Sequence, residues 1–493
     1  MKNNNNSHID VAIYFVAKLV PALLGFLNIF CITRSLTPER YGEYALVITA
    51  VLISSQIFGA WITQAMLYYL PKEKGGNEMV ASLGKMTFYS TLVGMVVIVI
   101  VLLFFKVGFE IAIAGAMVFV CQMYWTYLST YHQAREQAKI QLHATFFQVG
   151  VQLSVITTLF FLAQINVLSA ILSVCIGFFS GVYFFYMQNK RDEIKILSIQ
   201  KIPAKVFLPN VKLAFAYGGP MCAWFLFSQI YTFSDRFLLR NAGLSGDLGR
   251  YAAVRDLLLG VISMIAMPLL MVAHPMIMRI WHERRSTTEI QALIQKNLTV
   301  IFIIGCFLTL ILYDYGDVIL SIAFSKKYQL KNIEYALISA TILIGVASMY
   351  AHKALEVNRA TISMALITAV VAIFSVGANL ILVGKYGLSS IILVGLFSQI
   401  LYFAVASLLS RPMWRVVIAK ERVLVVCIAV IAIHVLSKIV DQNFSARLYL
   451  AIPWGLLIEL ICISVSALIF PEVHQLFAIN LKTKERPVLD SKI

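Results

Sequence analysis

The chain has 493 residues, of which 60% are hydrophobic and only 13% charged, and its mean hydropathy is +0.84. Soluble globular proteins carry about 25% charged residues, so this composition excludes a soluble globular domain and indicates a membrane protein. In a soluble chain, the formal net charge of +16 would suggest a nucleic-acid partner. Here the Lys and Arg residues lie mostly in short connections between apolar runs, where they act as signals for membrane orientation. No nucleic acid is therefore expected as a partner.

Long apolar runs follow one another along the chain, each able to cross a hydrocarbon core of about 30 Å. Because backbone polar groups in lipid must be paired within their own segment, these runs are predicted to be helices. The predicted fold class is all-α, a polytopic membrane protein with about fourteen transmembrane helices. In chain order the predicted spans cover residues 11–33, 44–70, 86–105, 111–131, 143–164, 167–188, 212–234, 251–277, 297–319, 333–352, 361–383, 389–409, 423–440 and 448–470.

The basic residues predict how the chain is oriented in the membrane. The connections on the same side as the two termini carry about twice as many Lys and Arg residues as those on the other side. Both termini are therefore expected in the cytoplasm, which agrees with an even number of spans. The longest polar connection, residues 189–210, is expected on the same side.

The chain also resembles itself. "PERYGEYALV" (38–47) matches "SGDLGRYAAV" (245–254), and a weaker match relates "NVLSAILSV" (166–174) to "YGLSSIILV" (386–394). The stronger match pairs Gly42 with Gly249, Tyr44 with Tyr251, Ala45 with Ala252 and Val47 with Val254. An offset of six spans predicts two six-helix lobes in the same orientation, a parallel repeat. The expected division is an N-terminal lobe at 1–188, a cytoplasmic loop at 189–210, a C-terminal lobe at 211–410, and an appended helix pair with a cytoplasmic tail at 411–493.

Charged residues within or beside the spans are the candidate site. A charge at the centre of a membrane helix costs about 2.5–3.5 kcal/mol, so such residues usually face a cavity or a partner. Lys18 lies within the first span, where it either extends to the cytoplasmic headgroups or lines a cavity. Asp235 and Arg236 interrupt "QIYTFSDRFLLR" near the predicted outer end of the seventh span, and Arg255 and Asp256 lie near the outer start of the eighth. These four residues form either an interfacial charge group or the lining of a cavity mouth.

Other polar residues in the spans have plainer explanations. Lys353 and Glu356 are spaced i,i+3 and are expected to form an interfacial ion pair. His434 and Lys438 share one face of the thirteenth span, and Glu459 lies in the fourteenth. A carboxyl group at that depth needs a partner or stays protonated. In the appended pair, Glu459 is expected to stabilise packing or to line a groove for a lipid tail.

Two segments resemble a known family. "LLGFLNIFCITRSLTPERYGEYAL" is similar to the first helix and loop of bacterial polysaccharide flippases, the Wzx group of the MOP transporter superfamily. "YGGPMCAWFLFSQIYTFSDRFLLR" with the following "GRYAAV" is similar to their seventh helix. The resemblance implies a flippase that moves undecaprenyl-diphosphate-linked oligosaccharide across the bacterial cytoplasmic (inner) membrane by alternating access. It also implies membrane lipid, and the polymerase and chain-length regulator of the same pathway, as partners.

The resemblance and the residue chemistry together assign roles. Lys18, Arg236 and Arg255 are the candidate substrate-binding cations, because a diphosphate crossing the membrane needs positive charge on its route. Asp235 and Asp256 are the candidate ion-coupling residues, with H⁺ or Na⁺ as the ion. The sequence contains no nucleotide-binding loop, no nucleophile and base pattern and no metal-ligand cluster, so no catalysis, cofactor or metal is expected.

Two other functions compete with this one. An ion-coupled multidrug exporter of the same superfamily typically has twelve spans and an acidic cavity, whereas this chain has about fourteen predicted spans and is rich in cations. A membrane-embedded glycan polymerase or ligase generally carries a large outer loop, and the predicted outer connections are all short.

Overall fold

The computed structural model describes residues 24–70, 77–135, 137–191, 203–358, 360–443 and 454–469. Over these residues the chain folds into helices and contains no strand, which confirms the predicted all-α class. A short helix, Leu24–Ser35, precedes the long ones. The others are α2 (Pro38–Tyr69), α3 (Asn77–Phe104), α4 (Phe109–Ala134), α5 (Ala138–Phe161), α6 (Val167–Arg191), α7 (Ala204–Asn241), α8 (Ser245–Glu283), α9 (Thr287–Ala323), η1 (Lys326–Tyr328), α10 (Asn332–Ala351), α11 (Lys353–Val357), α12 (Thr361–Tyr386), α13 (Leu388–Ser410), α14 (Lys420–Asn443) and α15 (Trp454–Ile469).

A helix overlaps each of the predicted spans. Ten helices among the described residues are long and apolar enough to cross, and α8, bent by 47°, would be an eleventh. The first and last predicted spans lie partly outside the described residues. A count of about fourteen therefore stays a prediction.

Several helices are longer than their apolar runs. α7 begins at Ala204 and ends at Asn241, with Pro209 and Pro220 inside it, whereas the apolar run covers only 212–234. α6 continues to Arg191, so the predicted 189–210 connection overlaps both helices, and its residues 192–202 lie outside the described part. Hydropathy marks the part of a helix that lies in lipid, while backbone hydrogen bonds extend the helix into polar sequence at either end.

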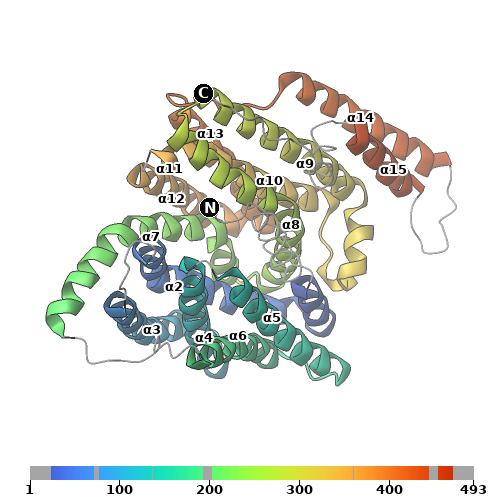
Figure 1. Ribbon diagram of the computed structural model, residues 1–493. Helices are drawn as coiled ribbons and strands as arrows, with labels where there is room; N and C mark the ends of the chain where they lie inside the picture. Colours follow the sequence, from blue (N-terminus) through green and yellow to red (C-terminus); the bar gives the residue numbers. More distant parts are fainter. Residues whose placement is uncertain are drawn as a thin grey trace, which may run out of the picture.

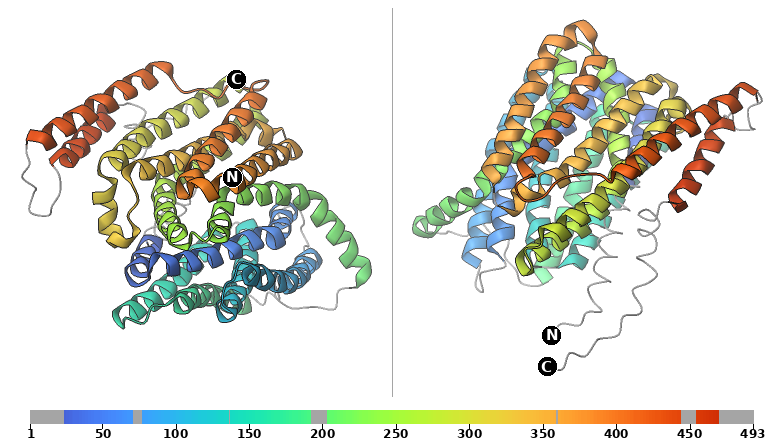
Figure 2. Two further views of the ribbon diagram at one scale, coloured as in Figure 1. Left: turned by 180° about the vertical axis from the view of Figure 1, so that it is seen from behind. Right: turned by 90° about the horizontal axis from the view of Figure 1, so that it is seen from above.

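The helices pack in a connected arrangement around α2, α7 and α8 (Figures 1 and 2). α2 packs against α3, α4 and α6, and α5 packs against α6 and α4. α7 packs against α12, and α10 packs against α9 and α13. α2 also contacts α7 and α8, and these contacts join the two groups of helices. α14 and α15 stand at one edge, packed on each other and on α9.

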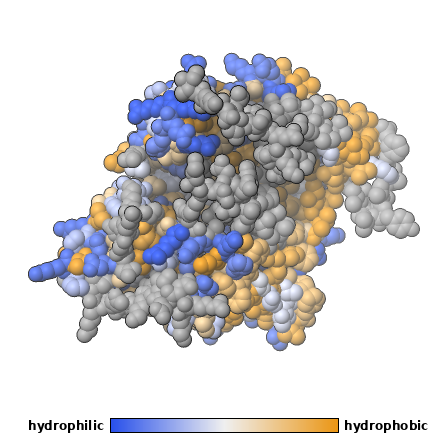
Figure 3. Space-filling model, viewed as in Figure 1, coloured by the Kyte–Doolittle hydropathy of each residue, from blue (hydrophilic) through white to orange (hydrophobic). Residues whose placement is uncertain are grey.

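The outside of the molecule is strongly apolar. Large aliphatic side chains such as Ile100, Ile373, Ile381 and Ile428 are exposed on the helices, and Figure 3 shows broad hydrophobic areas, including the region of α14. A soluble protein rarely exposes apolar patches of more than a few hundred Å². This surface is the one that lipid-facing helices require.

Candidate functional site

The two segments that match in sequence pack directly against each other in the structure. The first turns of α2 and α8 cross so closely that a Cβ atom added to Gly249 would lie 1.7 Å from the carbonyl oxygen of Pro38. A Cβ added to Gly42 would lie 2.9 Å from the carbonyl oxygen of Ser245. The matched glycines therefore allow a backbone-to-backbone contact that larger residues would prevent. The internal repeat is thus also an interface.

Arg236 links the three helices that meet beside this crossing. Its position in α7 is internal, because the helix continues to Asn241. One guanidinium nitrogen, Nη1, donates to Thr49 Oγ1 at 2.8 Å and more weakly to the carbonyl of Ala45 at 3.4 Å, both on α2. The other, Nη2, pairs with the carboxylate of Asp256 on α8. A single guanidinium thereby connects α2, α7 and α8.

Asp235 points to different partners. Its Oδ2 accepts hydrogen bonds from Tyr251 Oη at 2.7 Å and from Arg255 Nη1 at 3.1 Å, and its Oδ1 accepts from the backbone N–H of Arg236 at 2.7 Å. Arg255 Nη2 also donates to the carbonyl of Thr232 at 2.5 Å. Neighbouring residues on a helix lie about 100° apart, so adjacent charges face different helices. The side chains of Asp235 and Arg236 therefore do not pair with each other, and each pairs with a residue of α8.

We call Thr49, Asp235, Arg236, Tyr251, Arg255 and Asp256 the α2–α7–α8 network. Asp235, Arg236 and Arg255 are buried, while the side chain of Asp256 keeps 28% of its surface exposed. Both guanidinium groups also lie over the ring of Phe233, at 5.3 and 4.9 Å from its centroid, and such cation–π contacts strengthen when they are desolvated. The charges of two arginines and two aspartates cancel, so in this conformation the network is neutral and each arginine is paired with an aspartate.

The network follows the internal repeat. The alignment that pairs Gly42 with Gly249 also places Thr49 opposite Asp256, and these two residues are the partners of Arg236. The same alignment places Asn28 opposite Asp235. Tyr44 lies close to Asn28, just as Tyr251 contacts Asp235. Arg236 is therefore bound by corresponding positions of the two repeats, one polar and one charged.

The structure brings together four of the five residues predicted from the sequence. Lys18 lies outside the described residues. Thr49 and Tyr251 were not singled out as site residues, although Tyr251 belongs to the matched "GRYAAV" and the alignment points to Thr49. An apolar cavity of about 690 Å³ lies elsewhere, between α9, α10 and α14, and none of the network residues lines it.

A second charged group lies where α10 meets α11. Lys353 Nζ lies 2.5 Å from Glu356 Oε2, which confirms the predicted i,i+3 pair. The same ammonium group lies 3.0 Å from Nδ1 of His274 on α8. Since an ammonium group has no acceptor, His274 Nδ1 must accept this hydrogen bond. The sequence does not indicate this contact, because the two residues lie far apart in the chain.

Comparisons with known proteins relate the chain to one sequence family and to several solved membrane-protein structures. The sequence profile described as "Polysaccharide biosynthesis protein" matches residues 9–281, more than half of the chain and including the whole network. No curated protein sequence matches the chain. Among solved structures, the lipid II flippase MurJ in an inward closed conformation is similar with a TM-score of 0.71 and 13% identity, over 95% of this chain and 99% of that one.

Multidrug transporters share the same fold. An inward-facing MATE transporter of the MOP superfamily is similar with a TM-score of 0.62 and 11% identity, over 82% of this chain and 97% of that one. The MATE transporter DinF-BH gives 0.61 and 13%, over 83% and 96%. At such identities these likenesses establish the fold alone.

Proposed function

Since the chain belongs to the polysaccharide biosynthesis protein family, we propose that it is a flippase for lipid-linked oligosaccharide, without ATP hydrolysis and without a catalytic reaction. The proposed cargo is an undecaprenyl-diphosphate-linked repeat unit, moved across the bacterial cytoplasmic membrane. The family match, which covers the α2–α7–α8 network, carries this proposal. The earlier resemblance of two segments to polysaccharide flippases is confirmed by the same match.

The proposed mechanism is alternating access between two lobes, at 1–188 and 211–410, in which the crossing of α2 and α8 opens and closes one side of the transport path. In the conformation described here, Asp256 forms an ion pair with Arg236, and Asp235 forms one with Arg255. When α2 and α8 separate, these ion pairs lose their alignment and Arg236 and Arg255 become available to the diphosphate of the cargo. A guanidinium group binds phosphate oxygens in a bidentate manner, which suits it to this exchange.

The aspartates then need a new partner. A carboxylate that loses its arginine in a poorly solvated site is costly unless it binds a cation. We therefore propose that Asp235 and Asp256 take up H⁺ or Na⁺ when the cargo occupies the arginines. Binding of cargo and of ion would then be coupled through the same two arginines. Transfer of one charge through 100 mV supplies about 2.3 kcal/mol, enough to give the exchange a direction.

A cross-link between α2 and α8 tests this mechanism. A Cβ at Gly246 would lie 2.9 Å from Glu39 Oε1, so Glu39→Cys with Gly246→Cys places two thiols across the crossing. In a variant in which the seven native cysteines are replaced, a short reversible thiol cross-linker is expected to stop export of the polysaccharide, measured by immunoblot of surface glycan. Reduction should restore export. Each single-cysteine variant is the matched control, and undiminished export after complete cross-linking would contradict the mechanism.

Orientation is tested separately. With cytoplasmic termini, reporter fusions at residues 200 and 485 are expected to be active only with a reporter that functions in the cytoplasm. Activity of a periplasmic reporter at residue 200 would overturn both the orientation and the division into lobes.

Multidrug export is the second candidate, supported by the likeness to MATE transporters. Those matches cover 82–83% of this chain, whereas the MurJ match covers 95%. The longer match and the arginines of the network favour an anionic, lipid-linked cargo. Resistance to cationic drugs should therefore be unchanged when the gene is deleted, while surface glycan is lost.

A further inference from the structure

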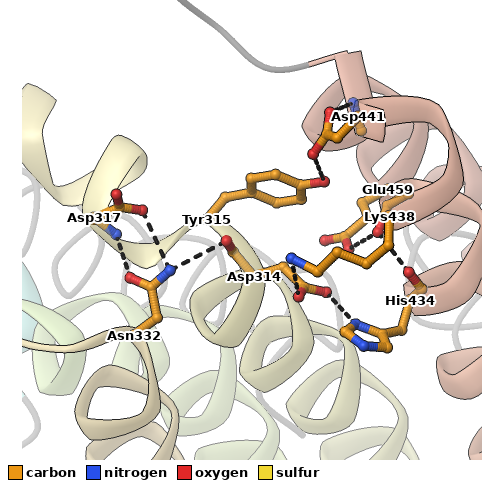
Figure 4. A network of polar contacts seen from close by, with 10 residues as sticks. Asp314, Tyr315, Asp317, Asn332, His434, Lys438, Asp441 and Glu459 are labelled. Atoms are coloured by element: carbon orange, nitrogen blue, oxygen red, sulfur yellow. Dashed lines mark hydrogen bonds and ion pairs between the residues drawn. The ribbon is translucent and has the colours of Figure 1, made fainter. Parts of the chain in front are cut away.

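A second polar network lies between α9 and the appended helices, away from the α2–α7–α8 network (Figure 4). We call Asp314 of α9, His434, Ser437 and Lys438 of α14, and Glu459 of α15 the appended-pair cluster. Ionisable residues inside membrane helices are expensive and usually functional. The family match ends at residue 281, so it assigns nothing to this cluster.

Asp314 is the centre of the cluster. Its side chain has no exposed surface. Its Oδ2 lies 2.7 Å from His434 Nδ1, and its Oδ1 lies 3.0 Å from Lys438 Nζ. The next residue, Tyr315, departs from helical geometry (φ −133°, ψ 22°), so α9 is broken where the carboxylate meets α14. A broken helix frees backbone groups, which makes this a place where α9 can change shape.

Glu459 is fully buried and lies within hydrogen-bond reach of Ser437 on α14 and of Asp314 on α9. Its Oε1 lies 3.0 Å from Ser437 Oγ, which also lies 2.9 Å from the carbonyl oxygen of His434. A hydroxyl group has one proton to donate. Ser437 Oγ can donate its proton to Glu459 Oε1 or to the carbonyl of His434. The hydrogen bond between Glu459 and Asp314 needs a proton on one of the two carboxyl groups, because carboxylates only accept. The geometry therefore fits a protonated carboxyl group.

The charge balance agrees. Asp314 and Glu459 would contribute two negative charges and Lys438 one positive charge, so the cluster needs one further proton to be neutral. His434 keeps 35% of its side chain exposed, whereas Glu459 is fully buried, so the carboxyl group of Glu459 gains most from that proton. Glu459 lies within electrostatic reach of both Asp314 and Lys438. An uncompensated charge in a buried site is the costly state, so one bound proton makes the cluster neutral. No group of three His, Cys, Asp or Glu side chains among the described residues is arranged to hold a metal ion instead.

The remaining titratable groups around the cluster have their own partners. Asp441 of α14 accepts from Tyr315 Oη at 2.7 Å and from the N–H of Gly455 at 2.8 Å. Asn332 Nδ2 on α10 donates to Asp317 Oδ1 at 3.3 Å, and Asn332 Oδ1 accepts from the backbone N–H of Asp317 at 2.9 Å. The ring of Tyr313 lies 5.9 Å from that of His434. None of these groups supplies the missing positive charge.

We propose that Glu459 is the proton-holding residue of a membrane-buried proton-binding site, formed with Asp314, His434, Ser437 and Lys438. The bound proton keeps the cluster neutral and so stabilises the packing of α14 and α15 against α9 at its break. Loss of the proton leaves one uncompensated negative charge and weakens this docking. His434 also lines the 690 Å³ apolar cavity, so loss of the proton from the cluster changes the charge next to that cavity. This proposal does not depend on which cargo the protein moves.

Infrared spectroscopy of the purified full-length protein in lipid nanodiscs tests the site. The difference spectrum between acidic and alkaline pH should contain a protonated-carboxyl C=O band that disappears as the pH rises. Glu459→Gln should remove this band. Glu421→Gln, at the exposed start of the same α14 helix, is the matched control and should leave it in place.

A second variant should shift the pH at which the carboxyl band titrates without removing the band. Asp314→Asn removes one negative charge, so Lys438 then balances an ionised Glu459, and the band should titrate at lower pH than in the wild type. The thermal unfolding midpoint of the wild type should fall as the pH rises through the titration, because the folded state then loses its proton. In Glu459→Gln this fall should be absent. A carboxyl band that is missing in the wild type, unchanged in Glu459→Gln, or unmoved in Asp314→Asn overturns the proposal.

Discussion

Arg236→Ala is expected to destabilise the folded protein and to abolish export of the polysaccharide. The Arg236 side chain has 3% of its surface exposed, and its guanidinium group binds Thr49 on α2 and Asp256 on α8 at the same time. Removing one partner of a buried ion pair costs about 3–5 kcal/mol. Because the Asp256 side chain keeps 28% of its surface exposed, we expect a loss near the lower end of that range. Chemical unfolding of the purified protein in detergent measures it.

A double variant that also removes Asp256 provides the decisive comparison with Arg236→Ala. In Arg236→Ala with Asp256→Ala, no carboxylate is left without its partner arginine, so the double variant should be more stable than Arg236→Ala. It should still fail to export, since the proposed substrate-binding cation is absent. Arg284→Ala is the surface control, because Arg284 is 67% exposed and pairs with Glu289 in solvent, where such a pair contributes about 0–1 kcal/mol. If Arg236→Ala were as stable and as active as Arg284→Ala, the network would have no role in either property.

The sequence predicts the helices well because their cause is local. An apolar run in lipid has no alternative to a helix, so each predicted run overlaps one. The ends are predicted less well. The apolar run of α9 covers 297–319, but the helix spans Thr287–Ala323 and is broken at Tyr315. Neither the polar extension nor the break changes the mean hydropathy of the run, so hydropathy cannot detect them.

The site is predicted as a group of residues but not as a set of pairs. The sequence places Asp235, Arg236, Arg255 and Asp256 at neighbouring helix ends, and the structure brings them together. It leaves the partner of each charge open, and the structure pairs Asp235 with Arg255 and Arg236 with Asp256. Which faces meet depends on how α7 and α8 are rotated and how closely α2 approaches them. The rotation of the helices and their distance are set by packing between segments far apart in the chain, and they cannot be derived from the pattern of a single sequence.

The close approach of α2 to α8 requires a residue without a Cβ atom at position 249. A Cβ at Gly249 would lie 1.7 Å from the carbonyl oxygen of Pro38, which belongs to the backbone and cannot rotate away. Gly249→Ala must therefore push the two helices apart, and overpacking of this kind typically costs about 1–3 kcal/mol. The separation also moves Asp256 and Tyr251, which follow Gly249 on α8, away from α2 and α7. We expect loss of export together with a lower unfolding midpoint.

The other glycines set a scale for this effect. Gly42→Ala should be milder, since its Cβ would lie 2.9 Å from Ser245 O, compared with 1.7 Å between a Cβ at Gly249 and Pro38 O. Gly260→Ala, on the same α8 helix, meets nothing within 4 Å and should gain about 0.5–1 kcal/mol from the better helix former. Under the proposed mechanism the crossing closes one side of the transport path, so Gly249→Ala should hold that side open even in protein that is folded. A thiol introduced by Ser245→Cys in a variant lacking the native cysteines should then react faster with a membrane-impermeant maleimide when Gly249→Ala is present than when Gly260→Ala is present. Equal reaction rates, with export lost only in Gly249→Ala, would mean that the crossing stabilises the fold without acting as a gate.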